Sequence, residues 1–156
     1  MPEWQPSSRF CFVCGRENPV GLKVRWANDR EAREIRGTVS VPEPFNGYPG
    51  VVHGGIVAAL LDETAGRSVL MEGTFLDLMV TRKMEVSYRR PTPTKTPLEL
   101  VGRLLRRDEG RAEAEAELRL PDGTVAARAT VFLARPPDEI TSRWAPELAH
   151  WKVDED

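Results

Sequence analysis

The stretch that decides the fold spans residues 52–71 and reads VHGGIVAALLDETAGRSVLM. It contains no proline, and beyond the Gly54-Gly55 pair only Gly66 interrupts a run of good helix formers. The stretch therefore predicts one long helix. Apolar residues cover most of its circumference, with bulky side chains on one side and small ones on another, which indicates a buried helix. The bulky side consists of Ile56, Val57, Leu60 and Leu61, and the small-residue side of Gly55, Ala58, Ala59, Asp62, Ala65, Gly66 and Val69.

Segments on both sides of this helix alternate apolar and polar residues in steps of two, the period of a β-strand. Two precede the helix, at residues 22–26 and 35–41, and are followed by a loop rich in turn formers at residues 42–50. Four come after it, at residues 80–90, 98–105, 111–120 and 124–134. The segment 111–120 is rich in Ala and Glu, which favour helix, but its strict alternation predicts a strand. Turn sequences at 108–110 and at Asp122-Gly123 join the last three segments.

This order predicts an α+β fold in which a curved, mainly antiparallel sheet wraps one long central helix. Such a sheet hides only part of the helix, so we expect a second copy of the chain to cover the rest. The length of 156 residues fits a single domain, residues 1–156. We expect it to carry an N-terminal arm, residues 1–18, and a C-terminal tail, residues 136–156. Trp144 and Trp151 predict that the tail forms a short helix or an arm packed on the surface.

Charge and hydropathy argue against several kinds of partner. The 22 basic and 24 acidic residues leave a formal net charge of -2, so no strong field points to nucleic acid or to an anionic membrane. No run approaches the roughly 18 apolar residues of a membrane span, and residues 1–9 lack the pattern of a secretory signal. The two cysteines, Cys11 and Cys14, are too few for a disulfide scaffold. We therefore expect a cytoplasmic protein.

Chemistry-bearing residues gather on the helix. Gly54 and Gly55 leave bare N–H groups at its positive end, where a carbonyl oxygen gaining negative charge would be stabilised; alternatively, they only shape a turn. Asp62 lies among the small residues, where a carboxylate is costly to bury without a partner or a wet cleft, which indicates a functional group. A hydrogen-bonded structural role is its alternative. Glu63 points about 100° away, and we expect it only to pair with Arg67 at i+4.

Distance along the helix predicts an assembly. Eight residues separate Gly54 from Asp62, about 12 Å, so the two cannot act on one carbonyl within a single chain. In two antiparallel copies of the helix, the Asp62 of one chain would approach Gly54 and Gly55 of the other. We therefore expect a homodimer, or a tetramer built as a dimer of dimers.

The stretch 46–66, in which His53-Gly54-Gly55 precedes Leu60-Leu61-Asp62-Glu63, resembles the signature of the hotdog-fold thioesterases, in particular the phenylacetate-degradation type. The sequence Cys11-Phe12-Val13-Cys14-Gly15, followed by Asn18-Pro19-Val20-Gly21-Leu22, is similar to the start of many bacterial members. The resemblance covers residues 10–135.

The resemblance implies a hotdog fold and the hydrolysis of acyl-CoA or aroyl-CoA thioesters to free acid and coenzyme A. It implies no metal or redox cofactor, with coenzyme A entering only as part of the substrate. By the same comparison, the N–H of Gly55, together with that of Gly54, would polarise the thioester carbonyl. Asp62 would act as general base or as nucleophile.

Three further residues receive roles from the resemblance. Asn46 lies near the position where family members hold water or substrate with an amide side chain. Thr81 falls where related enzymes carry a hydroxyl that positions the nucleophilic water, although an ordinary strand threonine is the alternative. His53 could serve as a base, but in the family it more often orients the loop at the helix start.

Two residue pairs outside the helix could bind ligands. Arg89 and Arg90, at a strand end, could hold a phosphate group of coenzyme A by bidentate contacts, with solvated surface charges as the alternative. Cys11 and Cys14 have the spacing of metal ligands, but the sequence offers no second Cys pair and no His pair. We therefore expect no zinc site within one chain and a structural role for both cysteines.

Two other functions stay open at this point. A non-catalytic acyl-CoA-binding or regulatory module would need the same cleft without the carboxylate. An acyl-thioester hydratase or dehydratase would need a histidine base in or just before the helix. His53 is the only histidine available there, which makes this function the weaker alternative.

Overall fold

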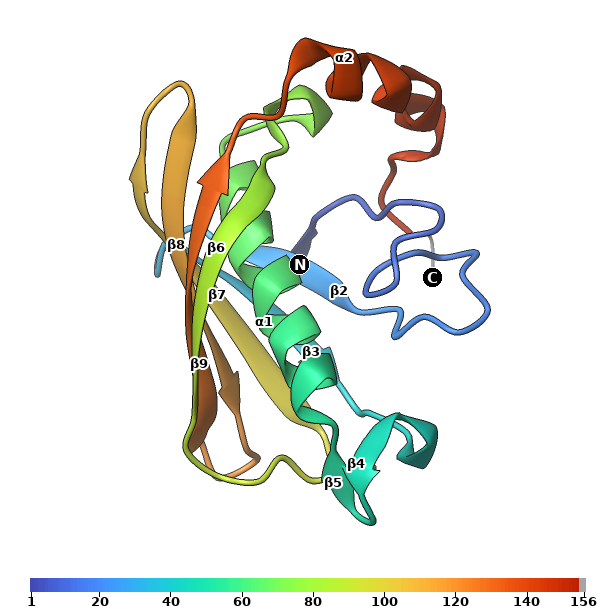
Figure 1. Ribbon diagram of the computed structural model, residues 1–156, viewed down its shortest axis with the longest axis vertical. Coiled ribbons are helices and arrows are strands. Elements are labelled where there is room, and N and C mark those ends of the chain that lie inside the picture. The colour runs from blue at the N-terminus through green and yellow to red at the C-terminus, as the bar shows by residue number, and fades with distance from the viewer. Residues whose placement is uncertain (155–156) are drawn as a thin grey trace.

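The computed structural model describes residues 1–154, so the last two residues of the expected tail lie outside the described part. A seven-stranded antiparallel sheet curves around the helix α1 (Gly54–Arg67), which confirms the expected α+β architecture (Figure 1). The order across the sheet is β1 (Glu3–Trp4), β2 (Arg25–Asp29), β3 (Glu34–Val39), β7 (Leu98–Arg107), β8 (Arg111–Arg119), β9 (Val125–Ala134) and β6 (Val80–Tyr88). Within residues 1–154, none of the helices combines the length and the apolar character of a membrane span.

Short elements complete the chain. The segment expected as a loop, residues 42–50, contains a 3-10 turn and one strand of a small hairpin that leads directly into α1. The N–H of His53 donates to the carbonyl oxygen of Phe45 at 3.0 Å, which ties this hairpin to the helix start. The short elements are η1 (Glu43–Phe45), β4 (Asn46–Tyr48), β5 (Val51–Val52), η2 (Ser68–Leu70), η3 (Phe75–Asp77), α2 (Asp138–Thr141) and η4 (Ser142–His150).

The periodicity of the sequence located the regular elements well. The four segments after the helix are β6, β7, β8 and β9, and the Ala- and Glu-rich segment is the strand β8. One early strand differs, because it begins at Arg25 rather than at residue 22. The cause is Lys23, whose φ of 54° breaks the extended conformation. The predicted helix is also shorter, since its last residues form the 3-10 turn η2.

Small side chains on the sheet let α1 pack closely against it. Ala114, Ala116 and Ala129 on β8 and β9 are buried. On β7, a Cβ atom at Gly102 would lie only 2.7 Å from the carbonyl oxygen of Thr64. These residues therefore fix the distance between helix and sheet, which a larger side chain would increase.

The helix is not covered evenly. The N- and C-terminal segments lie on the side of α1 away from the sheet (Figure 1). Ala65 and Val69 are buried, whereas Ala58 and Asp62 stay partly exposed. On the expected small-residue side, Ala58 and Asp62 are therefore accessible to a second copy, whereas Ala65 and Val69 are not.

The tail packs on the surface through aromatic contacts. The ring of Phe75 makes edge contacts with Trp144 and Trp151, at centroid distances of 6.5 and 5.4 Å. Trp151 also lies 5.2 Å from the guanidinium of Arg67, at the end of α1. The last turn of the helix is therefore linked to the C-terminal segment.

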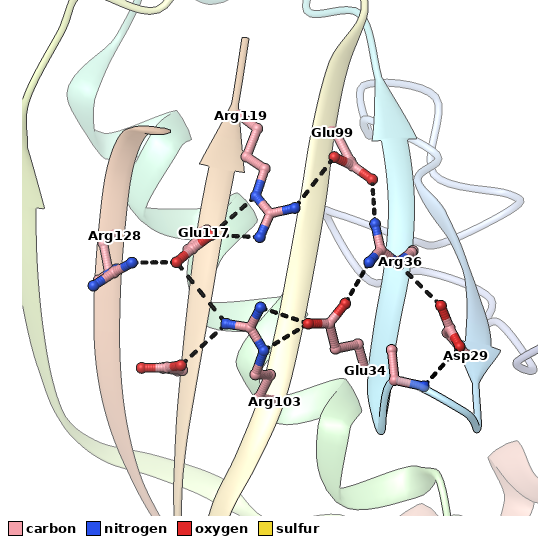
Figure 2. Close-up of polar contacts among 10 residues, drawn as sticks. Asp29, Glu34, Arg36, Glu99, Arg103, Glu117, Arg119 and Arg128 are labelled. Carbon is pink, nitrogen blue, oxygen red and sulfur yellow. Dashed lines mark hydrogen bonds and ion pairs between the residues drawn. The ribbon is translucent and has the colours of Figure 1, made fainter. Parts of the chain in front are cut away.

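The outer face of the sheet, away from α1, carries a network of ion pairs across β2, β3, β7, β8 and β9 (Figure 2). Glu34 and Glu117 are buried in it, at 6% and 4% exposure. Arg103 on β7 donates to Glu34 on β3 at 2.7 Å, and Arg128 on β9 donates to Glu117 on β8. Because each buried carboxylate has basic partners from neighbouring strands, the network fastens the strands together on the face opposite the helix.

Candidate active site

The structure brings together two of the predicted site residues, Asp62 on α1 and Thr81 on β6. The Thr81 hydroxyl donates a hydrogen bond to Asp62 Oδ1 at 2.6 Å. Within residues 1–154, no basic side chain forms an ion pair with Asp62, and Oδ2 accepts no hydrogen bond. Asp62 is therefore an oriented carboxylate with one oxygen free to accept a proton, on the partly exposed side of α1.

At the start of α1, the histidine and the two glycines have different roles. His53 is the N-cap, and its Nδ1 accepts the Gly55 N–H at 2.9 Å. The His53 carbonyl oxygen accepts the N–H groups of Ile56 and Val57. The Gly54 N–H has no partner among the described residues, so it is the bare amide at this helix end. A substrate oxygen that used the Gly55 N–H would have to displace the imidazole.

Tyr88 contacts the start of α1, although the sequence analysis did not identify it as a site residue. Its hydroxyl donates to the carbonyl oxygen of Gly54 at 2.7 Å, and its ring lies 3.7 Å from the position of a Cβ at Gly54. Tyr88 ends β6, whereas Thr81 lies near its beginning. The same edge strand therefore contacts both Gly54 and Asp62.

Asn46 belongs to the scaffold of the preceding loop. Its side-chain amide donates to Glu43 Oε1 at 2.7 Å, and Glu43 also accepts from the Thr94 hydroxyl at 2.6 Å and from the Gly50 N–H at 2.9 Å. These hydrogen bonds lower the pKa of Glu43 to about 2, and the bond from Thr94 has the largest effect. Among the described residues, no hydrogen bond links Asn46 to Asp62. Its position fits a loop anchor around an ionised Glu43.

A pocket of about 680 Å³ opens at the helix start. Arg89 and Arg90 form part of its wall, and both are exposed. Their backbone N–H groups donate to the Ala126 carbonyl oxygen at 2.8 and 3.0 Å, which fixes the direction of the chain there. The pocket is lined by Gly47, Tyr48, Val51, Val52, His53, Gly54, Val57, Tyr88, Arg89, Arg90, Pro91 and Thr92. The arginine pair and the bare amide thus share one pocket.

Asp62 does not line this pocket. It lies eight residues further along α1 than Gly54, about 12 Å at the rise of a helix. Within one chain, the structure therefore holds two half-sites, the carboxylate with Thr81 and the helix start with its pocket.

Glu63 has more contacts than the sequence suggested. The predicted pair with Arg67 is present, with Arg67 Nε donating to Glu63 Oε1 at 3.2 Å. Cys14, from the N-terminal arm, also contacts both of these side chains. Partial burial, with the side chain 30% exposed, raises the pKa of Glu63 to about 7. Nothing in the sequence indicated the contact with Cys14, because Cys14 lies 49 residues from Glu63 and 53 residues from Arg67.

Comparison with known proteins places the chain in a family. The Thioesterase superfamily model matches residues 49–127. The chain is 35% identical over 109 residues to the acyl-coenzyme A thioesterase THEM4 of Rattus norvegicus, which covers 70% of this chain and 45% of the rat protein. The matched part of this chain therefore corresponds to less than half the length of the rat protein.

Two solved structures share the fold. A crystal structure described as a thioesterase superfamily protein is 32% identical, with a TM-score of 0.73, over 81% of this chain and 60% of that chain. A phenylacetic acid degradation-related protein of Ralstonia eutropha JMP134 is 26% identical, with a TM-score of 0.65, over 72% of this chain and 85% of that chain. The resemblance inferred from residues 46–66 is thus confirmed, and the chain belongs to the thioesterase superfamily, with the hotdog fold of its relatives.

Proposed function

We propose that the protein hydrolyses acyl-CoA or aroyl-CoA thioesters to a free acid and coenzyme A. The observation that carries the proposal is the Asp62 carboxylate, which Thr81 holds at 2.6 Å and which has no basic partner among residues 1–154. An oriented carboxylate with one oxygen free among the described residues, on the partly exposed side of α1, can act as a base or as a nucleophile. The two relatives described above are both named as thioesterases, which supports the proposed hydrolysis.

The reaction follows from the two half-sites. The Gly54 N–H would donate to the thioester oxygen as it gains negative charge. Asp62, as general base, would take a proton from water while that water attacks the carbonyl carbon. Collapse of the tetrahedral intermediate would break the C–S bond and release coenzyme A, whose sulfur would receive the proton from Asp62. Alternatively, Asp62 would attack the carbonyl carbon directly as a nucleophile. This would release coenzyme A and form a mixed anhydride, which water would then hydrolyse.

A second copy of the chain is needed to join the half-sites. Antiparallel copies of α1 would bring the Asp62 of one chain to the Gly54 of its partner. The edge strand β6 supports this assembly, because Val80 and Tyr88 on it are 40% and 54% exposed and no strand within residues 1–154 pairs with its outer edge. We therefore propose a homodimer, or a tetramer formed from two such dimers.

Arg89 and Arg90 would bind the nucleotide part of the substrate. Both lie on the wall of the pocket at the helix start, and guanidinium groups bind phosphate by paired hydrogen bonds. In this arrangement the phosphates of coenzyme A approach the arginines while the thioester reaches the Gly54 N–H. Coenzyme A is thus recognised as part of the substrate.

The Asp62→Asn variant tests the proposed reaction. It keeps the size of the side chain and removes the charge, so kcat for thiol release from a panel of short, long and aryl-CoA thioesters should fall about 10²- to 10⁴-fold. Far-ultraviolet circular dichroism should be unchanged. Asp138→Asn, at an exposed position in α2, is the matched control and should retain full activity. A wild-type rate in Asp62→Asn would contradict the mechanism.

The same panel separates the alternative functions. An acyl-CoA-binding module would bind the esters without releasing thiol, in the wild type as in the variant. A hydratase would hydrate an enoyl-CoA ester and would use His53. The cap formed by His53 Nδ1 on the Gly55 N–H favours an orienting role for this residue.

A further inference from the structure

Three potential metal ligands converge between the N-terminal arm and α1. Sγ of Cys11, Sγ of Cys14 and a carboxylate oxygen of Glu63 all lie within 4.8 Å of one another. The distance from Cys14 Sγ to Glu63 Oε1 is 3.7 Å. In a tetrahedral zinc site, with Zn–S near 2.3 Å and Zn–O near 2.0 Å, the sulfur and oxygen ligands are about 3.5 Å apart. The Cys14–Glu63 distance is therefore close to that of such a site, and Cys11 Sγ lies within 4.8 Å of both ligands.

The turn that carries the two cysteines is shaped to present both sulfur atoms. The N–H groups of Val13 and Cys14 point at Cys11 Sγ, at 3.4 and 3.5 Å. The Gly15 N–H donates to the Cys11 carbonyl oxygen at 2.7 Å, and a Cβ at Gly15 would lie 2.5 Å from that oxygen. The turn therefore requires glycine at this position. Backbone N–H donors directed at sulfur stabilise a metal-bound thiolate.

The charges around the cluster favour a divalent cation. Two thiolates and one carboxylate carry three negative charges when they bind a metal. Arg67 supplies one positive charge, because its Nη2 lies 2.8 Å from Cys14 Sγ and its Nε 3.2 Å from Glu63 Oε1. A cation of charge +2 would make the set neutral. Neutrality matters here because Cys14 and Arg67 are each only 2% exposed.

We propose that Cys11, Cys14 and Glu63 bind a zinc ion, with a solvent molecule in the fourth position. Cys11 and Glu63 are partly exposed, so the open position faces the solvent side of the cluster. The sequence argued against zinc because it offered only two cysteines and no histidine pair. Glu63 supplies the third ligand. It is distant from the cysteines in the sequence and lies beside them only in the folded chain.

The site would clamp the N-terminal arm onto the helix that carries Asp62. Arg67 already binds the arm through the Pro6 carbonyl oxygen, and the Gln5 side chain donates to the Arg67 carbonyl oxygen at 3.1 Å. A metal shared by Cys11, Cys14 and Glu63 would add a direct link between arm and helix. The inference does not depend on the proposed hydrolysis, because Asp62 points toward β6 while Glu63 points toward the arm.

Metal titration of the reduced 156-residue chain tests the site. Cobalt(II), added without oxygen to the metal-free protein, should bind with one ion per chain. It should give the near-ultraviolet thiolate-to-cobalt absorption and the intense visible bands of a tetrahedral site, and zinc should abolish both. Cys11→Ser and Cys14→Ser should remove the thiolate absorption or weaken it. Glu63→Gln should weaken zinc binding at least about tenfold.

Glu17→Gln is the matched control, because Glu17 is an exposed carboxylate of the arm, and it should bind zinc like the wild type. Absence of the thiolate absorption in wild-type protein with both thiols free would overturn the proposal, whatever the folding of the variants. Equal zinc affinity in Glu63→Gln and Glu17→Gln would overturn the role of Glu63. A Cys11–Cys14 disulfide that resists reduction would also overturn it.

Discussion

The Thr81 hydroxyl donates a 2.6 Å hydrogen bond to the Asp62 carboxylate, and this contact joins the edge strand β6 to the partly exposed side of α1. It fixes the orientation of Oδ1 and leaves Oδ2 free among the described residues. A carboxylate held in this way is oriented before substrate arrives, which is a requirement of efficient proton transfer.

Removal of the Thr81 hydroxyl should therefore slow catalysis. We expect Thr81→Val to lower kcat about 10- to 100-fold, because Asp62 would lose its orientation while keeping its charge. Thr81→Ser should restore most of the rate. The measurement is kcat and KM for thiol release, with circular dichroism as the check on folding. Thr38→Val, at an exposed position on β3, is the control, and an active Thr81→Val would show that the contact has no orienting role.

The helix start allows a backbone donor to be removed cleanly. Gly54 is the first residue of α1, where proline is well tolerated, and His53 before it has φ and ψ of -55° and 134°, which suit a following proline. Gly54→Pro should therefore fold normally but lose the bare N–H. We expect kcat to fall about 10²- to 10³-fold.

Gly54→Ala is the matched control for the proline variant. It keeps the N–H, and its Cβ would make only ordinary contact with Tyr88, at 3.7 Å. Its kcat should stay within a few fold of the wild type. Similar losses in both variants would mean that bulk at residue 54, rather than the missing donor, is responsible.

The predicted features share one physical property, which is local periodicity. Alternation in steps of two located β6 to β9, even in β8, where Ala and Glu favour helix. The proline-free run of good helix formers located α1, and Asp62 was conspicuous as a carboxylate among the small residues of that helix. Each of these signals lies within about 20 neighbouring residues, so the sequence alone contained them.

The features that the sequence could not predict depend on long-range packing. The Asp62–Thr81 contact requires β6 to lie beside α1, although Thr81 itself was singled out by family resemblance. The Tyr88 contact with Gly54 joins residues 34 positions apart. The approach of Cys14 to Glu63 depends on how the arm docks, for which residues 1–18 give no periodic signal. Glu63 was therefore interpreted only through its neighbour at i+4.

The buried Glu117 on the outer face of the sheet should make stability depend on pH. Burial alone would raise the pKa of Glu117, but hydrogen bonds from Arg119 and Arg128 outweigh it, and the pKa is lowered. A lowered folded-state pKa stabilises the protein above the unfolded value, about 4.3, and this contribution is lost as the pH falls through the folded value. Glu117→Gln should lower the free energy of unfolding at pH 7 by about 1–3 kcal/mol.

Urea unfolding of both proteins between pH 7 and pH 3 measures this effect. The difference between wild type and Glu117→Gln should be constant at neutral pH and should shrink below about pH 4. Glu72→Gln is the control, because the Glu72 side chain is 77% exposed in its pair with Arg30, and it should change stability little. A difference that persists unchanged at pH 3 would exclude ionisation of Glu117 as the cause.

Mixed oligomers should reveal whether each active site uses two chains. Asp62→Asn lacks the carboxylate and Gly54→Pro lacks the bare amide, so each variant alone should keep at most about 1% of the wild-type rate. In a mixed dimer, one site would combine the intact helix start of the Asp62→Asn chain with the intact Asp62 of the Gly54→Pro chain. Random mixing makes half of the dimers mixed, with one of two sites intact, so about one quarter of wild-type activity should return. Each variant refolded with itself is the control, and a mixture as inactive as these controls would mean that the half-sites do not meet across chains.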